Sequence, residues 1–200
     1  MSFNNYKNIN DVLQQFPFSY QEDNFIKEIE FNIDPYFVNR LELIIKEGIV
    51  FNSEYAICEN IISPILVEIW LKYREKLILW SHQPLKYDEN LSGIPDYMIA
   101  QRSPRGKVIL EQPYLILVEA KKDNFEEGWG QCFAELIAVQ KLNNNQNNIV
   151  FGIVSNGKIW EFGKLQDSIF TKNLKYYTLE ELAKLMGAIS FLFQETLKQI

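Results

Sequence analysis

The stretch LILVEAKK, residues 115–122, decides the fold of this chain. It opens with four consecutive apolar residues, as expected for a strand that is covered on both faces. A helical pattern follows at residues 123–143, with Asp123 or Asn124 as its N-cap, and then a second apolar run, NIVFGIV, at residues 148–154. Such a strand–helix–strand passage predicts two parallel strands joined by a crossover helix.

Upstream of this passage, residues 52–73 show the apolar spacing of a helix. Ser53 is its expected N-cap, and Pro64 is expected to kink the helix or split it in two. Strand-like runs follow at residues 76–85, 94–102 and 111–122, close enough in sequence to form an antiparallel meander. Residues 1–50 have mixed helical and turn character and carry no motif that we can interpret.

Downstream, Asn156-Gly157 predicts a hairpin between two strands within residues 148–165. The segment 178–199 predicts a last helix that opens with a capping box from Thr178 to Glu181. Together these elements predict an α/β fold: a mixed central β-sheet flanked by helices. At 200 residues and 23.6 kDa, a single domain spanning residues 1–200 is expected.

Composition limits the chemistry. One histidine, His82, excludes a zinc site built from several imidazoles, and we expect His82 to be structural. Two irregularly spaced cysteines give no disulfide framework, and no apolar run is long enough for a membrane span or a signal peptide, so we expect a cytoplasmic protein without a membrane partner. The net charge of −6 argues weakly against a polyanionic partner.

The two central strands carry charges that are unexpected in a core sheet. Asp96 opens one strand, while Glu119 and Lys121 end the next. Because residues two apart in a strand share a face, Glu119 and Lys121 lie on one side and Ala120 on the other. Partly desolvated charges need partners, which Lys121 and a divalent cation between Asp96 and Glu119 would supply. A cation and a neighbouring lysine suit phosphodiester hydrolysis, because both stabilise negative charge and activate water.

Gly93-Ile94-Pro95-Asp96, followed by Glu119-Ala120-Lys121, resembles the PD-(D/E)XK nuclease superfamily, which has the restriction-endonuclease-like fold. The likeness is nearest to the nuclease domain of type I restriction enzymes and to small stand-alone relatives. It covers residues 52–164, leaving residues 1–51 as an N-terminal helical extension and residues 177–199 as a C-terminal helix. The resemblance implies Mg²⁺ or Mn²⁺ held by Asp96, Glu119 and the Ala120 carbonyl, with Lys121 as the catalytic lysine.

Two further residues complete the predicted site. The family places an acid on the first helix, and helical periodicity favours Glu54 over Glu59, because Glu54 falls in line with the buried stripe. Glu59 stays open as the alternative, since Pro64 can shift the phase of the helix. Gln131 lies on a face of small residues of the later helix and, as in relatives with a glutamine there, is expected near the metal.

We therefore expect a metal-dependent nuclease that hydrolyses DNA phosphodiester bonds in restriction, defence or repair. The alternative is a non-catalytic nuclease-fold module that acts as a binding or assembly subunit. Expected partners are DNA, a second copy of the chain through the last helix, and a larger restriction or defence complex. Five basic residues are candidates for a DNA path, although a solvated face explains them as well: Arg102, Arg105, Lys107, Lys122 and Lys141.

Overall fold

The computed structural model describes residues 2–144 and 148–200. Within these residues, eight strands form one mixed sheet in the order β1-β9-β8-β7-β6-β5-β2, with β10 paired to β8, and β3 and β4 form a separate hairpin. The strands are β1 (Ser19–Asp23), β2 (Leu77–Ser81), β3 (Leu85–Lys86), β4 (Ser92–Gly93), β5 (Tyr97–Arg102), β6 (Leu110–Ala120), β7 (Val150–Ser155), β8 (Ile159–Gln166), β9 (Ile169–Asn173) and β10 (Tyr177–Thr178). The predicted α/β class, a mixed sheet flanked by helices, is confirmed.

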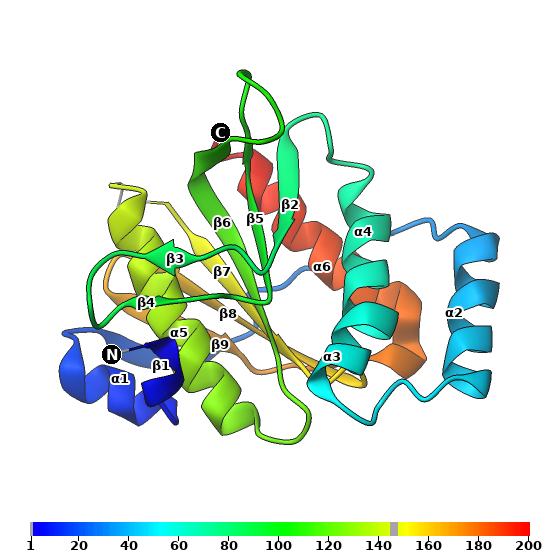
Figure 1. The fold of residues 1–200 in the computed structure, drawn as a ribbon, viewed down its shortest axis with the longest axis horizontal. Helices are drawn as coiled ribbons and strands as arrows, with labels where there is room; N and C mark the ends of the chain where they lie inside the picture. The colour runs from blue at the N-terminus through cyan, green and yellow to red at the C-terminus, as the bar shows by residue number, and fades with distance from the viewer. Residues whose placement is uncertain (1, 145–147) are drawn as a thin grey trace.

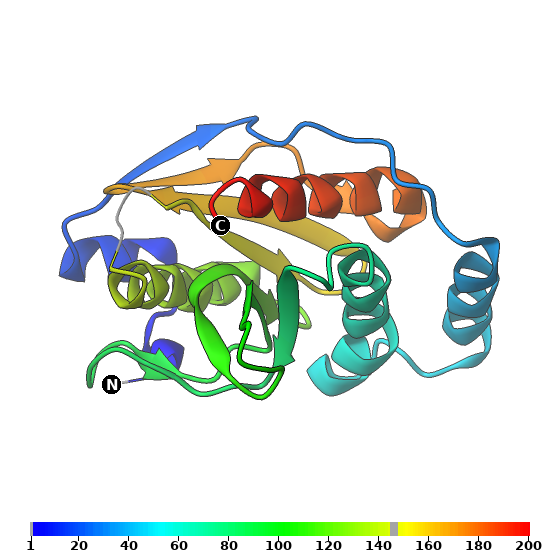
Figure 2. The same cartoon turned by 90° about the horizontal axis from the view of Figure 1, so that it is seen from above.

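Helices cover both faces of the sheet, as Figures 1 and 2 show. One face packs against α5 (Phe125–Leu142), α1 (Ile9–Gln15) and the short helix η1 (Phe3–Asn5). The other packs against α6 (Leu182–Leu197), η3 (Leu179–Glu181), α2 (Pro35–Glu47) and the helical run α3 (Glu54–Ile57), η2 (Cys58–Ile62) and α4 (Ser63–Trp70). Successive residues of β6 enter opposite cores: Leu117 packs on the α5 side and Val118 on the α6 side.

The crossover that decides the fold is present as predicted. Strands β6 and β7 are parallel, and α5 joins them. The Asn124 side chain caps α5 by accepting a hydrogen bond from the Glu127 amide, so Asn124, and not Asp123, is the N-cap. β2, β5 and β6 form the antiparallel meander, and β7 and β8 form the hairpin around Asn156-Gly157, where Gly157 has a φ of +81°.

Pro64 divides the first long helix in two. A kink and such a split are the two outcomes that the sequence predicts. Ser53 caps α3 through the Ala56 amide. The turn before Pro64, η2, is π-helical, and α4 follows with Pro64 in its first turn. A proline has no N–H to donate to the preceding turn, and a π-helical turn accommodates that break in the hydrogen-bond ladder.

Three expectations differ from the structure. The segment 1–51 is not purely helical, because β1 pairs with β9 in parallel at the sheet edge; its five residues are all exposed and show no apolar alternation. β9 and β10 were likewise not predicted. The Thr178–Glu181 capping box does not form, since Thr178 is held in β10 and makes no side-chain cap, so α6 starts at Leu182. The apolar face of α6 is buried in the core of the chain, and a dimer stays a prediction.

Within the described ranges, no helix has both the length and the apolar character needed to cross a membrane.

Candidate functional site

Asp96 and Glu119 face each other across two strands. In the β5–β6 ladder Tyr97 pairs with Val118, so the same antiparallel register places Asp96 opposite Glu119. Residues opposite each other in a ladder share a face, and here it is the face toward α5, because Leu117, two residues before Glu119, belongs to that core. The Ala120 amide donates to Asp96 Oδ2 over 2.7 Å and fixes that carboxylate at the end of β6.

Lys121 lies beside Glu119, as the two-residue spacing predicts. Its Nζ is 2.9 Å from Glu119 Oε1, and the two side chains are only 12% and 8% exposed. Helix α5 approaches closely at this point: a Cβ built on Gly128 would lie 2.9 Å from Lys121 Cγ and 2.6 Å from Val154 Cγ1. Glycine at position 128 therefore leaves the room that the lysine stem needs.

Burial and mutual repulsion shape the ionisation of the acids. Burial, and next the charge of Asp96, raise the pKa of Glu119 to about 8, although Lys121 acts in the opposite direction. Burial also raises the pKa of Asp96, against the opposing effects of the Ala120 amide and Lys121. For Lys121 burial disfavours the charge, but Glu119 outweighs it and raises the pKa of the ammonium. Burial and the repulsion between the two acids therefore disfavour their joint ionisation.

His82 lies beside Asp96, a position that the expected structural role does not include. Its amide donates to the Asp96 carbonyl over 3.0 Å, and its Nε2 lies 3.6 Å from Asp96 Oδ1. It has a φ of +52°, in the left-handed region that non-glycine residues rarely adopt. His82, Asp96 and Glu119 therefore form a row across three strands. Only the antiparallel register, which one-dimensional patterns do not give, brings His82 here.

Of the two candidate helical acids, Glu54 lies at the site. Its Oε1 accepts a hydrogen bond from the Lys122 amide over 3.4 Å, just beyond the end of β6, and its side chain is exposed. Glu54 also acts electrostatically on Asp96, Glu119 and Lys121. Glu59 is exposed in the π-helical turn. Glu54 is thus the acid that contacts the end of β6, although it is exposed and does not lie in the buried stripe, and its role as a metal ligand stays a prediction.

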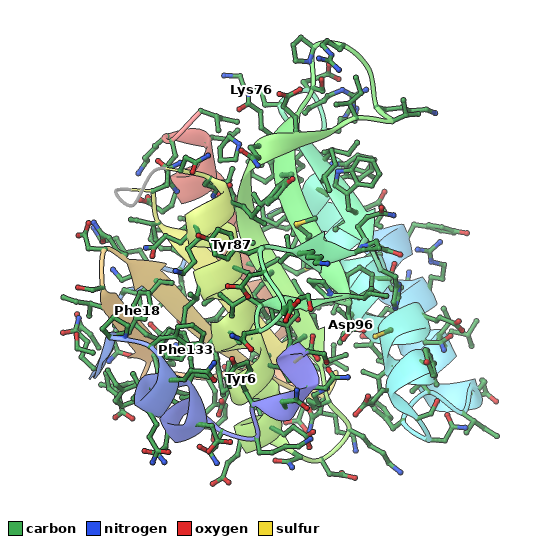
Figure 3. The ribbon with its side chains drawn as sticks, turned by 60° about the vertical axis from the view of Figure 1, so that its left-hand side comes forward. Tyr6, Phe18, Lys76, Tyr87, Asp96 and Phe133 are labelled. Atoms are coloured by element: carbon green, nitrogen blue, oxygen red, sulfur yellow. The ribbon has the colours of Figure 1, made fainter. Side chains whose placement is uncertain are left out.

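Gln131 is buried on α5 and its Nε2 donates to Asn4 Oδ1 of the N-terminal segment. That segment packs tightly beside the site, because a Cβ on Gly130 would meet the Tyr6 carbonyl at 2.5 Å and a Cβ on Gly93 would meet Phe3 Cδ2 at the same distance. Figure 3 shows Asp96 near this segment and far from Lys76. Residues 2–6 therefore pack against α5 and against Gly93, three residues before Asp96, and their sequence gives no sign of this packing.

The oxygen donors present suit a hard divalent cation. Asp96, Glu119 and Glu54 offer carboxylates, and such ions bind carboxylate, carbonyl and water oxygens. Among residues 2–144 and 148–200, however, no three histidine, cysteine or acidic side chains already stand close enough to form a metal cage. An ion here would depend on two or so carboxylates together with the Ala120 carbonyl and water. The buried Oε1 of Gln131 and Oε2 of Glu135, which lack hydrogen-bond partners among the described residues, mark unsatisfied acceptors in this region.

Most of the candidate DNA-path residues lie away from the site. Arg102 ends β5, and its amide donates to the Lys76 carbonyl, so it lies about 20 Å from Asp96 at roughly 3.3 Å per strand residue. Arg105 and Lys107 follow in the same distal loop, and Lys141 is at the far end of α5, over the Tyr87 ring. Only Lys122 lies next to the acids.

A cavity of about 610 Å³ lies on the opposite face of the sheet, between α2 and η3. Its lining is largely apolar, including Val38, Leu41, Ile45 and Leu179. It does not belong to the site, because the acids point to the α5 face.

No model of a known protein family matches this chain, and no curated protein matches it. The function therefore has to be argued from the site itself.

Proposed function

We propose that this protein is a nuclease of the PD-(D/E)XK type that requires Mg²⁺ or Mn²⁺ and hydrolyses DNA phosphodiester bonds. The observation that carries the proposal is the placement of Asp96 opposite Glu119, with the Lys121 ammonium 2.9 Å from Glu119, at one end of a mixed sheet. Two acids and a lysine on adjacent strands form the minimum set for this chemistry. The chemistry requires no histidine.

Asp96, Glu119 and the Ala120 carbonyl would hold the cation, which when bound makes a water more acidic and stabilises charge on a phosphodiester. The Ala120 amide holds the Asp96 carboxylate in place. Lys121, kept protonated by Glu119, offers a positive charge to the scissile phosphate and a donor that orients the attacking water. His82, which is about half exposed, would lie beside Asp96 on the side from which the substrate approaches.

The test is digestion of linear and supercoiled DNA with Mg²⁺, with excess EDTA as the blank. Asp96→Asn, Glu119→Gln and Lys121→Met should each lower the cleavage rate roughly 100-fold or more, because each removes a group that acts on the transition state. Glu126→Gln, an exposed residue in the first turn of α5, is the matched control and should cleave like the wild type. Wild-type cleavage that persists in excess EDTA would contradict the proposal.

A second candidate is a nuclease-fold module that binds without cutting. Two observations favour it: Glu119 is only 6% exposed, and no metal cage of three acidic, histidine or cysteine side chains is preassembled within the described part of the chain. Calorimetric titration with Mn²⁺ separates the two functions. A chain that binds neither Mn²⁺ nor Mg²⁺ and cuts no DNA would be such a module.

A further inference from the structure

Helix α5 carries a buried carboxylate that the proposed reaction does not yet use. Glu135 is 2% exposed, and its Oε2 finds no hydrogen-bond partner in residues 2–144 and 148–200. Burying a polar group without a partner costs about 1–3 kcal/mol, and more when the group is charged. A core position that needed only volume would be better filled by leucine or methionine, so Glu135 requires a partner that the described residues do not supply.

Glu135 lies on the face of α5 that is directed to the acids. It follows Gln131 by four residues and Gly128 by seven, so the three share one face of the helix. Gly128 is the point at which this face meets Lys121. After burial itself, the largest influence on the Glu135 carboxyl is the charge of Glu119, followed by that of Asp96, and together they raise its pKa well above the ordinary value.

The charges of the cluster indicate what is missing. Glu54, Asp96, Glu119 and Glu135 bring four carboxylates against the single ammonium of Lys121, so the fully ionised cluster carries three uncompensated negative charges. One divalent cation offsets two of them. Hard cations of this kind bind oxygen and are readily held by several carboxylates together with water.

We propose that Glu135 serves the same cation as Asp96 and Glu119, contributing a third carboxylate from α5 through one bound water. This inference rests on the proposed function, because it assumes that the cation site exists. It adds a helix-borne acid on the α5 side, in addition to Glu54 at the end of α3. The competing explanation is that Glu135 is a neutral core acid with no part in ion binding.

The experiment compares Mn²⁺ binding by isothermal titration calorimetry at pH 8 for the wild type, Glu135→Gln and Glu126→Gln. Glutamine keeps the shape of the side chain and removes its charge, while Glu126→Gln removes a charge from the exposed side of the same helix. We expect Glu135→Gln to weaken Mn²⁺ binding about 10-fold to 100-fold and Glu126→Gln to leave it unchanged. In EDTA, the melting temperature of Glu135→Gln should equal or exceed that of the wild type, whereas Mn²⁺ should raise it less.

Each result supports or overturns the inference. If the wild type binds no Mn²⁺, the proposed function fails together with the inference. If the wild type binds Mn²⁺ and Glu135→Gln binds it equally well, only the inference fails. If Glu135→Gln does not fold, Glu135→Met takes its place. A structure of the wild-type protein grown with Mn²⁺ also decides without any variant. In that structure Glu135 Oε2 must lie within one-water reach of the ion, and a greater separation overturns the inference.

Discussion

Replacing Lys121 with methionine removes the ammonium and keeps most of the side-chain stem. At an effective dielectric constant of about 20, opposite unit charges 2.9 Å apart attract by about 6 kcal/mol, and desolvation offsets much of this energy. Removing one partner of a buried pair typically costs about 3–5 kcal/mol, because the other charge is left uncompensated. Since both side chains keep some exposure, we expect the free energy of unfolding to fall by about 3 kcal/mol at pH 9.

The cost should shrink at lower pH. Glu119 has a pKa of about 8 in the folded protein, so at pH 6 its carboxyl is mostly protonated and loses little when the ammonium is removed. We expect a loss of about 1 kcal/mol or less at pH 6. Urea denaturation in EDTA at the two pH values measures both losses. Lys122→Met, a change at the neighbouring exposed lysine, is the control and should change stability by less than about 0.5 kcal/mol.

Mg²⁺ adds a second readout to the same variant. A cation at Glu119 takes over the role of the ammonium, so saturating Mg²⁺ should restore most of the stability of Lys121→Met at pH 9, while DNA cleavage stays lost. Equal stability losses for Lys121→Met and Lys122→Met would refute the buried pair. Full cleavage by Lys121→Met would refute the catalytic role of the lysine.

Three further predictions follow from the packing and ionisation of the site. Gly128→Ala gains about 1 kcal/mol of helix propensity but pushes a methyl group against Lys121, so DNA cleavage should drop while Mn²⁺ affinity, measured by calorimetry, stays the same; unchanged cleavage would contradict this contact. Gly93→Ala forces the Phe3 ring away, so it should destabilise the protein by about 1–3 kcal/mol and speed proteolysis of the N-terminal segment, and a wild-type digestion pattern would count against it. In EDTA, the wild type should lose stability as the pH rises from about 5 to 8, because the folded protein keeps a proton on Glu119 that the unfolded chain, with an ordinary pKa of 4.5, releases. Mg²⁺ should reduce this loss of stability. A stability in EDTA that rises over this pH range would contradict the raised pKa of Glu119.

The parts of the fold that could be predicted are those whose side chains meet the core in a regular pattern. Residues 115–118 are apolar because β6 is covered on both faces, and α5 shows its burial through apolar residues all round. β1 could not be predicted in this way, because its side chains are exposed and it pairs with β9 along an edge of the sheet, where burial leaves no apolar alternation in the sequence. The capping box failed because strand pairing of Thr178 took precedence over a local signal.

Some residues of the candidate site could likewise be grouped from the sequence, and others could not. Asp96, Glu119 and Lys121 could be grouped because they lie on two strands that are neighbours in sequence, where spacing and register correspond. His82 reaches Asp96 only through the pairing of a third strand. Glu135 had one available signal, an acid one turn after Gln131 in the largely apolar middle of α5, but its proximity to Glu119 depends on how α5 packs on the sheet.

The most direct test of the account is a crystal of the wild-type protein grown with Mn²⁺ and measured at the manganese absorption edge. We expect an anomalous peak within coordination distance of the Asp96 and Glu119 carboxylates, and no such peak in a crystal of the Asp96→Asn variant. Anomalous density elsewhere, or none at a Mn²⁺ concentration that supports DNA cleavage, would contradict the claim that these two acids hold the ion.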